Sequence, residues 1–278
     1  MISEKYKEEK FDIIVLAGQS NATGSGFGAV KDEYVPDPDI LYLRDVYPVD
    51  YRINERGEKF LDCQFPTDYE IAEAEEKESA EGRGKTGNFS LIFAREYKKK
   101  FLQPGRKILI VFAPVGGTGF CRKQWGVGNI LDNRMNDMTA RALALNKENR
   151  IVAFLWHQGE LDADENRDKN YEQKEEFYFN SVKTMLDNFT GRFNCKNVPV
   201  ITAGFTDDWK SKNEASCAPV YEAYKRLADS RKNFVFIDTE GLRSNNQKID
   251  FPEDVYHFCR EDLYVLGKKY FDEYCLLR

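Results

Sequence analysis

Histidines and clustered metal ligands are scarce in this chain. Its 278 residues include two histidines, His157 and His257, and its six cysteines form no Cys-x-x-Cys pair. Two histidines so far apart, without further ligands beside them, do not make the pattern of a metal site. We therefore expect no catalytic metal and no other cofactor, and we expect the thiols to be reduced.

Long apolar runs and an excess of basic residues are also missing. No run approaches the roughly 20 apolar residues that span a bilayer, and Met1–Lys10 is charged and lacks the hydrophobic core of a signal peptide. We expect a cytoplasmic protein without a membrane partner. The net charge of −6 arises from segments of mixed sign without a basic stripe, which argues against a nucleic-acid partner. The composition leaves the oligomeric state open.

The chain does contain a regular alternation of strand-like and helix-like segments. Short apolar runs predict strands near residues 11–17, 40–44, 107–113, 151–156, 198–203 and 234–238. Helical spacing predicts helices near residues 89–101, 133–145, 170–189, 219–230 and 260–274. This alternation predicts a three-layer α/β/α sandwich around a central parallel sheet of about five strands. Because no linker, repeat or low-complexity tract interrupts it, we expect one domain over residues 1–278.

One stretch, residues 45–87, departs from that rhythm. It is long, charged and rich in turn residues, with an acidic segment from Glu70 to Glu81. A loop of this length in a compact domain usually has a function, so we expect an insertion that shapes the substrate site. The alternative is a solvated surface excursion with a short helix of its own. The polar segment from Arg83 to Asn88 is suited to returning near the site.

A candidate nucleophile follows the first apolar run. Gly18-Gln19-Ser20-Asn21 comes directly after residues 11–17, and small residues occupy positions 22–26. A sharp turn after a buried parallel strand places side chains at the carboxyl edge of the sheet, where α/β folds hold their sites. A plain strand–turn or a phosphate-cradling loop is the alternative. The segment is not a P-loop, because no Gly-Lys-Ser/Thr follows.

A candidate acid–base pair lies near the other end of the chain, in Asp254-Val255-Tyr256-His257-Phe258. A serine nucleophile needs an imidazole to take its proton and a carboxylate to orient that imidazole. Taken alone, the segment also suits a helix-capping Asp beside a surface His. The order Ser, Asp, His fits α/β-hydrolases as well. However, Ser20 follows the first strand, and Asp254 and His257 share one loop, which argues against that fold.

Two further strand ends carry candidate oxyanion donors. Residues 107–113 lead into Gly116-Gly117, and residues 151–156 lead into Gln158. A glycine N–H and the Gln158 amide, together with the N–H of Ser20, would give three donors to a developing oxyanion. A tight turn and a solvated loop amide are the respective alternatives.

These segments together resemble the SGNH hydrolase superfamily, which has a flavodoxin-like fold. They resemble more closely its sialate O-acetylesterase-like group, which includes the acetyl xylan esterases of carbohydrate esterase family 6. The blocks that carry the resemblance are Gly18-Gln19-Ser20-Asn21, Gly116-Gly117-Thr118, Trp156-His157-Gln158-Gly159-Glu160-Leu161-Asp162 and Asp254-Val255-Tyr256-His257-Phe258. The resemblance implies Ser20 as nucleophile, His257 as general base and Asp254 as its acid. It also implies an oxyanion hole from Ser20, Gly116 or Gly117, and Gln158.

The resemblance implies a serine esterase that removes O-acetyl groups from a carbohydrate such as acetylated xylan or sialic acid. Two departures from the family pattern are His157, where a Tyr is usual, and Gly119, where Thr118 is often followed by Ser. An esterase of lipid or other non-sugar esters, and a non-catalytic glycan-binding protein, are the alternatives. Either Glu160 or Asp162 could replace Asp254 as the acid, but we expect them to brace the Gln158 loop. The candidate substrate contacts are Gln19, Asn21, His157, Glu160, Trp125 and Arg122.

Overall fold

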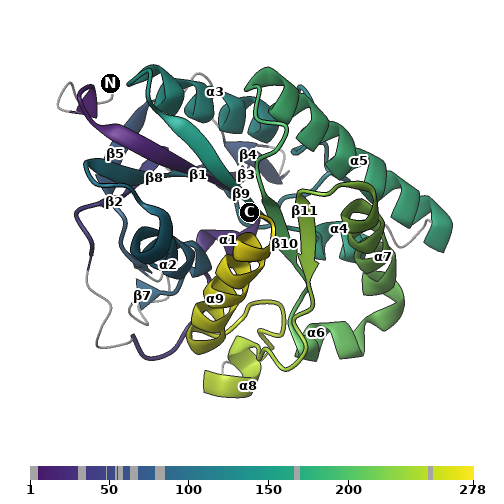
Figure 1. The fold of residues 1–278 in the computed structure, drawn as a ribbon. Coiled ribbons are helices and arrows are strands. Elements are labelled where there is room, and N and C mark those ends of the chain that lie inside the picture. The colour runs from purple at the N-terminus through teal and green to yellow at the C-terminus, as the bar shows by residue number, and fades with distance from the viewer. Residues whose placement is uncertain are drawn as a thin grey trace.

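A seven-stranded sheet organises the chain, in the order β11-β10-β9-β1-β8-β2-β5 (Figure 1). The computed structural model describes residues 6–30, 36–47, 49–53, 55, 59–62, 68–78, 85–165, 170–249 and 253–278. The strands of the sheet are β1 (Lys10–Gly18), β2 (Ile40–Asp45), β5 (Tyr69–Glu73), β8 (Arg106–Phe112), β9 (Arg150–His157), β10 (Val200–Ala203) and β11 (Phe234–Ile237). All neighbours are parallel except β5, which pairs antiparallel with β2 at one edge.

Six of these strands were predicted, and the α/β architecture is confirmed, but the sheet is larger than about five strands. The strand without a prediction is β5, within the acidic stretch of the expected insertion. Its sequence, Tyr-Glu-Ile-Ala-Glu, lacks an apolar run because only one residue, Tyr69, is fully buried at this sheet edge. A half-exposed edge strand gives a weak pattern in a single sequence.

Helices cover both faces of the sheet (Figure 1). One face carries α3 (Ile130–Ala144), α5 (Tyr171–Arg192) and α7 (Glu214–Ser230), and the other carries α2 (Phe89–Phe101) and α9 (Arg260–Leu276). Alternate residues of β1 enter opposite cores: Ile13 and Val15 belong to the first, and Ile14 and Leu16 to the second. Burial on both faces explains why β1 appears as a continuous apolar run.

Four short helices follow strand ends at the carboxyl edge. They are α1 (Ser20–Thr23), α4 (Glu160–Glu165), α6 (Asp207–Lys212) and α8 (Asn245–Ile249), which come after β1, β9, β10 and β11. Each spans less than two helical turns, too short for a helical period to show in the sequence. In the described part of the chain, no helix has both the length and the hydrophobicity needed to cross a bilayer.

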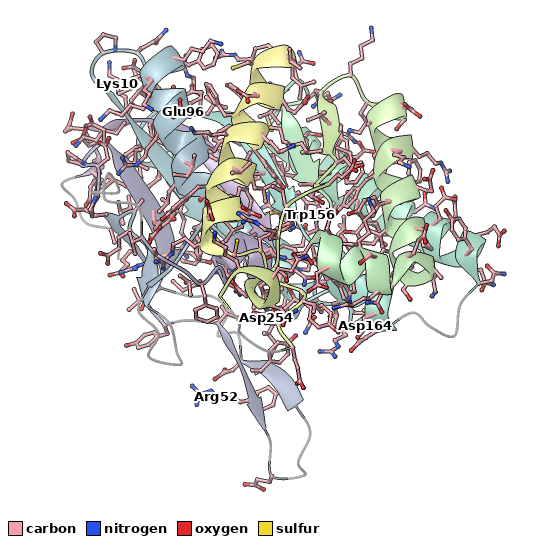
Figure 2. The ribbon with its side chains drawn as sticks, turned by 90° about the horizontal axis from the view of Figure 1, so that it is seen from below. Lys10, Arg52, Glu96, Trp156, Asp164 and Asp254 are labelled. Carbon is pink, nitrogen blue, oxygen red and sulfur yellow. The ribbon has the colours of Figure 1, made fainter. Side chains whose placement is uncertain are left out.

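The described part of the stretch between β2 and α2 forms antiparallel strands, not the short helix that was the alternative. Two small hairpins flank β5: β3 (Asp50–Ile53) with β4 (Lys59–Asp62), and β6 (Lys77–Glu78) with β7 (Lys85–Thr86). Figure 2 shows the β3–β4 hairpin, marked by Arg52, projecting on the side of Asp254 and away from Lys10 at the start of β1. Within this stretch residues 48, 54, 56–58, 63–67 and 79–84 lie outside the described residues.

Candidate active site

The central position of β1 brings three strand ends together. It lies between β8 and β9, and its last residue, Gly18, pairs with His157 at the end of β9. Gly18 has φ +131°, and a Cβ there would lie 2.0 Å from the carbonyl oxygen of His157. Only glycine allows the chain to turn this close to β9. The turn delivers Ser20 to the carboxyl edge at the point where the strand order reverses, which is where α/β sheets bind ligands.

Ser20, His257 and Asp254 form a continuous chain of contacts at this edge. His257 Nε2 lies 2.8 Å from Ser20 Oγ, although the two residues are 237 positions apart. On the other side of the ring, His257 Nδ1 lies 2.8 Å from Asp254 Oδ1. The His257 side chain is 29% exposed, so the imidazole is partly open to solvent. This is the geometry that a serine nucleophile, its base and its orienting acid require.

Asp254 is held in its ionised form by its neighbours. Its second oxygen, Oδ2, accepts a hydrogen bond of 2.7 Å from Asn245 Nδ2. Burial opposes ionisation, but the hydrogen bonds from His257 and Asn245 and the charge of His257 outweigh it, so the pKa of Asp254 lies below its ordinary value. An ionised carboxylate beside Nδ1 can orient an imidazole so that its Nε2 faces a neighbouring hydroxyl.

Asn21 joins the turn of Ser20 to the loop of His257. Its Nδ2 donates to the carbonyl of Tyr256 at 3.0 Å, and its Oδ1 accepts from the N–H of Phe258 at 3.1 Å. Asn21 is fully buried, and its Nδ2 also donates to Glu160 Oε1 at 2.8 Å. Asn21 therefore holds the loop of His257 against the turn of Ser20. The expectation that it contacts substrate is wrong, because no part of the side chain reaches the surface.

The two candidate oxyanion glycines face different partners. A Cβ on Gly116 would lie 3.6 Å from Ser20 Cβ, so this residue stands directly opposite the serine. A Cβ on Gly117 would instead meet the ring of Tyr51 at 3.5 Å. Tyr51 comes from β3, and its hydroxyl donates to the Gly117 carbonyl at 2.5 Å and accepts from Gln124 Nε2 at 2.7 Å. The β3–β4 hairpin therefore braces the glycine loop.

The side-chain amide of Gln158 donates its hydrogen bonds to buried groups of the protein. The side chain is fully buried, and its Nε2 lies 2.7 Å from Asp162 Oδ2, 3.1 Å from Gln19 Oε1 and 3.1 Å from the Thr118 carbonyl. Two N–H bonds facing three internal acceptors leave no donor for a substrate oxygen. The structure thus corrects the expectation that Gln158 completes the oxyanion hole, because its amide ties the ends of β8, β9 and β1 together.

The two acidic residues after Gln158, Glu160 and Asp162, are both buried and accept hydrogen bonds from neighbouring segments. Asp162 accepts from the N–H groups of Phe120 and Cys121 at 3.0 and 2.7 Å in addition to Gln158. Burial raises the pKa of Asp162 and of Glu160, although hydrogen bonds to each carboxylate act in the opposite direction. Glu160 is 3% exposed and its Oε1 accepts a hydrogen bond from Asn21, so it is not a substrate contact.

His157 is buried completely and does not line the site. Its Nδ1 contacts the hydroxyl of Tyr270 at 3.1 Å, and its ring packs against Phe89 and Phe258. Burial lowers its pKa to about 3, so the ring is neutral near pH 7. The expectation of a substrate contact is corrected: in a sequence, the position beside Gln158 resembles a site, but the side chain points into the core beneath α9.

Of the three remaining candidate contacts, two are buried and one is exposed. Gln19 is 5% exposed and accepts from Gln158, and Trp125 is 1% exposed with its Nε1 donating to Thr118 Oγ1 at 2.9 Å, so neither contacts substrate. Arg122 differs, because its side chain is 38% exposed and pairs with Glu165. Of the six proposed contacts, Arg122 alone reaches the surface.

Several residues that hold the site had no signal in the sequence. Asn245, Thr206 and Tyr51 act through side-chain hydrogen bonds to other loops: Asn245 to Asp254 and Ser25, Thr206 to Val255, and Tyr51 to Gly117. Asn and Thr are common turn residues, so their identity does not mark them as functional. Of the segment from Arg83 to Asn88, Arg83 and Gly84 lie outside the described residues, and Asn88 Nδ2 donates to the carbonyl of Ala22, near Ser20, at 3.0 Å.

The fold is an α/β sandwich of flavodoxin-like layout, and Ser20, His257 and Asp254 meet at the carboxyl edge of its sheet. Among the described residues, no group of three or more His, Cys, Asp or Glu is arranged to hold a metal ion. The chemistry available is a hydroxyl beside an imidazole and a carboxylate, with Gly116 close to the hydroxyl, which suits acyl transfer.

Comparison with known proteins identifies the family. The family model for "carbohydrate esterase, sialic acid-specific acetylesterase" matches residues 10–276. The chain belongs to this family and is a carboxylic ester hydrolase of the carbohydrate acetylesterase type. The resemblance to the sialate O-acetylesterase-like group is confirmed, whereas membership of carbohydrate esterase family 6 stays a prediction. No curated protein sequence matches significantly.

Solved structures share the fold over nearly the whole chain. NanS superposes with a TM-score of 0.70 at 19% identity, covering 97% of this chain and 98% of NanS. A protein from Arabidopsis thaliana gives 0.66 at 22% identity, covering 96% and 98%. A carbohydrate acetylesterase from Xanthomonas citri gives 0.58 at 14% identity, covering 94% of this chain and 55% of that protein. At these identities the similarity is one of fold.

Proposed function

We propose that this protein removes O-acetyl groups from a carbohydrate through Ser20, His257 and Asp254, by way of an acetyl-enzyme. The observation that carries the proposal is the pair of 2.8 Å contacts, from Ser20 Oγ to His257 Nε2 and from His257 Nδ1 to Asp254 Oδ1. These are hydrogen-bond distances, short enough for direct proton transfer between serine and imidazole.

The first half of the reaction releases the sugar. Ser20 Oγ bonds to the acetyl carbonyl carbon while His257 Nε2 takes the hydroxyl proton, and the carbonyl electron pair moves onto its oxygen. When the intermediate collapses, the bond between that carbon and the sugar oxygen breaks. His257 gives its proton to the departing oxygen, leaving a free sugar hydroxyl and acetyl-Ser20.

The second half restores the enzyme. A water molecule transfers a proton to His257 as its oxygen bonds to the acetyl carbon. The bond to Ser20 Oγ then breaks, His257 returns the proton to Oγ, and acetate leaves. Asp254 remains ionised throughout, consistent with its lowered pKa, and stabilises the protonated imidazole in both halves.

The oxyanion in this mechanism is stabilised by backbone donors. We assign the N–H groups of Ser20 and Gly116 to this role, because Gly116 stands opposite Ser20 and Gly117 faces Tyr51. Ser20 is the first residue of α1, and the first N–H groups of a helix have no partner within it. Preorganised donors of this kind are each worth about two to three orders of magnitude in rate.

The substrate class follows from the family, and the sugar itself is part of the proposal. The family description names sialic acid, and acetylated xylan is the other candidate. Arg122 is the one expected contact that reaches solvent, and it lies on the glycine-loop side through its link to Tyr51.

The test is acetate release by wild type, Ser20→Ala and a matched control. The panel contains O-acetylated sialic acid, acetylated xylan and p-nitrophenyl esters of increasing chain length. Ser230→Ala is the control, because this exposed serine ends α7 and bonds only locally to Leu227. We expect Ser20→Ala to lose at least about four orders of magnitude in kcat, and Ser230→Ala to match wild type.

The outcomes separate the alternatives. Ser20-dependent release from a sugar supports the proposal and begins to name the sugar. Activity confined to longer acyl esters would assign the enzyme to non-sugar esters, and activity that survives in Ser20→Ala would overturn the nucleophile. Binding of the acetylated sugars without turnover by wild type would instead indicate a non-catalytic glycan-binding protein.

A further inference from the structure

The side of the site on which the sugar lies follows from the direction of proton transfer. His257 must deliver its proton to the oxygen that leaves with the sugar, so that oxygen lies within hydrogen-bond distance of Nε2. In the proposed function the acetyl oxygen is bound by the N–H groups of Ser20 and Gly116, and not by His257. The sugar ring is therefore next to the loop that carries His257, and side chains exposed on this loop are the ones it meets.

Tyr256, the residue before His257, has a large side chain that is exposed on this loop. It is 40% exposed, in contrast to Phe258 on the other side of His257, which is fully buried. Its ring rests on the indole of Trp209, with centroids 5.1 Å apart and planes inclined by 43°. Trp209 is itself 1% exposed, so it supports Tyr256 from beneath.

The backbone around Tyr256 is fixed at several points. Its carbonyl accepts from Asn21, the preceding Val255 carbonyl accepts from Thr206 Oγ1, and the following His257 carbonyl accepts from the N–H of Asn245 at 2.9 Å. The loop is therefore held in place by hydrogen bonds, and the Tyr256 ring is exposed from a fixed backbone. A rigid aromatic side chain loses little conformational entropy when a ligand binds to it.

We propose that Tyr256, supported by Trp209, is the platform on which the pyranose ring of the departing sugar stacks. The face of an aromatic ring is electron-rich and attracts the polarised C–H groups on the less polar face of a sugar. This inference rests on the proposed function, because it takes His257 as the proton donor to the sugar oxygen. It assigns the departing sugar a contact that neither the acetyl group nor a small alcohol can make.

The contact has a specific kinetic signature. Stacking holds the sugar equally in the ground state and the transition state, so it lowers KM for sugar esters and leaves kcat unchanged. An ester whose alcohol is too small to reach Tyr256 gains nothing from it. Aromatic contacts of this kind are worth a factor of roughly three to ten in affinity.

The experiment compares Tyr256→Ala and Tyr256→Phe with wild type on two kinds of ester. O-acetylated sialic acid and acetylated xylan oligomers test the sugar contact, and vinyl acetate tests the catalytic groups without a ring in the leaving group. Tyr171→Ala is the matched control, because Tyr171 is also a tyrosine with 42% exposure but lies at the start of α5. Circular dichroism checks that each variant is folded.

We expect Tyr256→Ala to raise KM for the sugar ester roughly three- to tenfold, with kcat unchanged and with kcat/KM for vinyl acetate within about twofold of wild type. Tyr256→Phe, which keeps the ring, and Tyr171→Ala should both behave like wild type. An equal loss on both esters would mean that Tyr256 only positions His257, and an unchanged KM for the sugar would also overturn the proposal. A failure of the proposed function would look different, because Ser20→Ala would then retain activity on both esters.

Discussion

The two histidines of this chain both lie beside the turn of Ser20, yet their environments are opposite. His257 is 29% exposed and has a partner on each ring nitrogen, the hydroxyl of Ser20 and the carboxylate of Asp254. His157 is fully buried, its Nδ1 meets Tyr270, and its Nε2 has no hydrogen-bond partner. Position next to a site motif therefore does not by itself place an imidazole in the site. His257 differs from His157 in being partly exposed and in having a carboxylate on the nitrogen opposite Ser20.

The carboxylates nearest to the two histidines also differ, both in their distance from the ring and in the direction of their pKa shift. Asp254 contacts His257 Nδ1 at 2.8 Å and has a lowered pKa, whereas Glu160 lies 3.7 Å from His157 Nε2 and has a pKa raised by burial. At 3.7 Å the second pair is beyond hydrogen-bond distance. Glu160 uses its Oε1 to receive Asn21 instead, so it supports the turn and not the ring.

Replacing each histidine should give the largest contrast. We expect His257→Ala to lower kcat for acetate release by at least about four orders of magnitude, because the serine loses its base. His157→Phe should stay within about threefold of wild type, since it keeps a ring in the core and its one lost hydrogen bond is balanced by removal of the unpartnered Nε2. A large loss of kcat in a folded His157→Phe would overturn the assignment of His157 to the core.

Replacing each carboxylate by its amide should give the next largest effect. Asp254→Asn removes the charge that orients His257, and we expect kcat to fall by about three to four orders of magnitude. Glu160→Gln keeps an acceptor for Asn21, and we expect a loss of less than about tenfold. Acetate release at saturating substrate measures both. If Glu160→Gln were the more severe of the two, Glu160 would be the acid and Asp254 the support.

The smallest effect should appear in the pH dependence of stability. Burial lowers the pKa of His157 to about 3 from an ordinary value of 6.5. Between these values the unfolded chain binds a proton that the folded chain does not, so the free energy of unfolding falls as the pH falls through this window. From pH 7 to pH 5 this costs about 2 kcal/mol.

Urea denaturation of wild type and His157→Phe at both pH values measures this cost. Wild type should lose about 2 kcal/mol more than the variant between pH 7 and pH 5. Using the difference between the two proteins cancels the contributions of Asp254, Glu160 and Asp162, which titrate in both. Equal losses would show that His157 is protonated within the folded core or exposed to solvent.

Much of the framework could be predicted from the sequence, because it depends on local patterns. Helix α2 begins and ends where its apolar spacing predicted, and the end of each buried run placed Ser20, Gly116 and Gln158 at one sheet edge. Parallel strands separated by helices leave few other arrangements for such segments. The half-exposed strand β5 and the short helices did not have enough periodic residues to be recognised.

Within the candidate site, the sequence by itself determined which residue types stand at the ends of β1, β8 and β9 and in the loop before α9. The tertiary structure decided which of them are exposed and which are paired. It buried His157 and Trp125, turned the amide of Gln158 inward, put Gly116 rather than Gly117 opposite Ser20, and left Tyr256 exposed on Trp209. The reason is physical: spacing along a chain fixes only local neighbours, whereas burial and hydrogen-bond partners are set by strand register and by contacts between residues as far apart as Asn21 and Phe258.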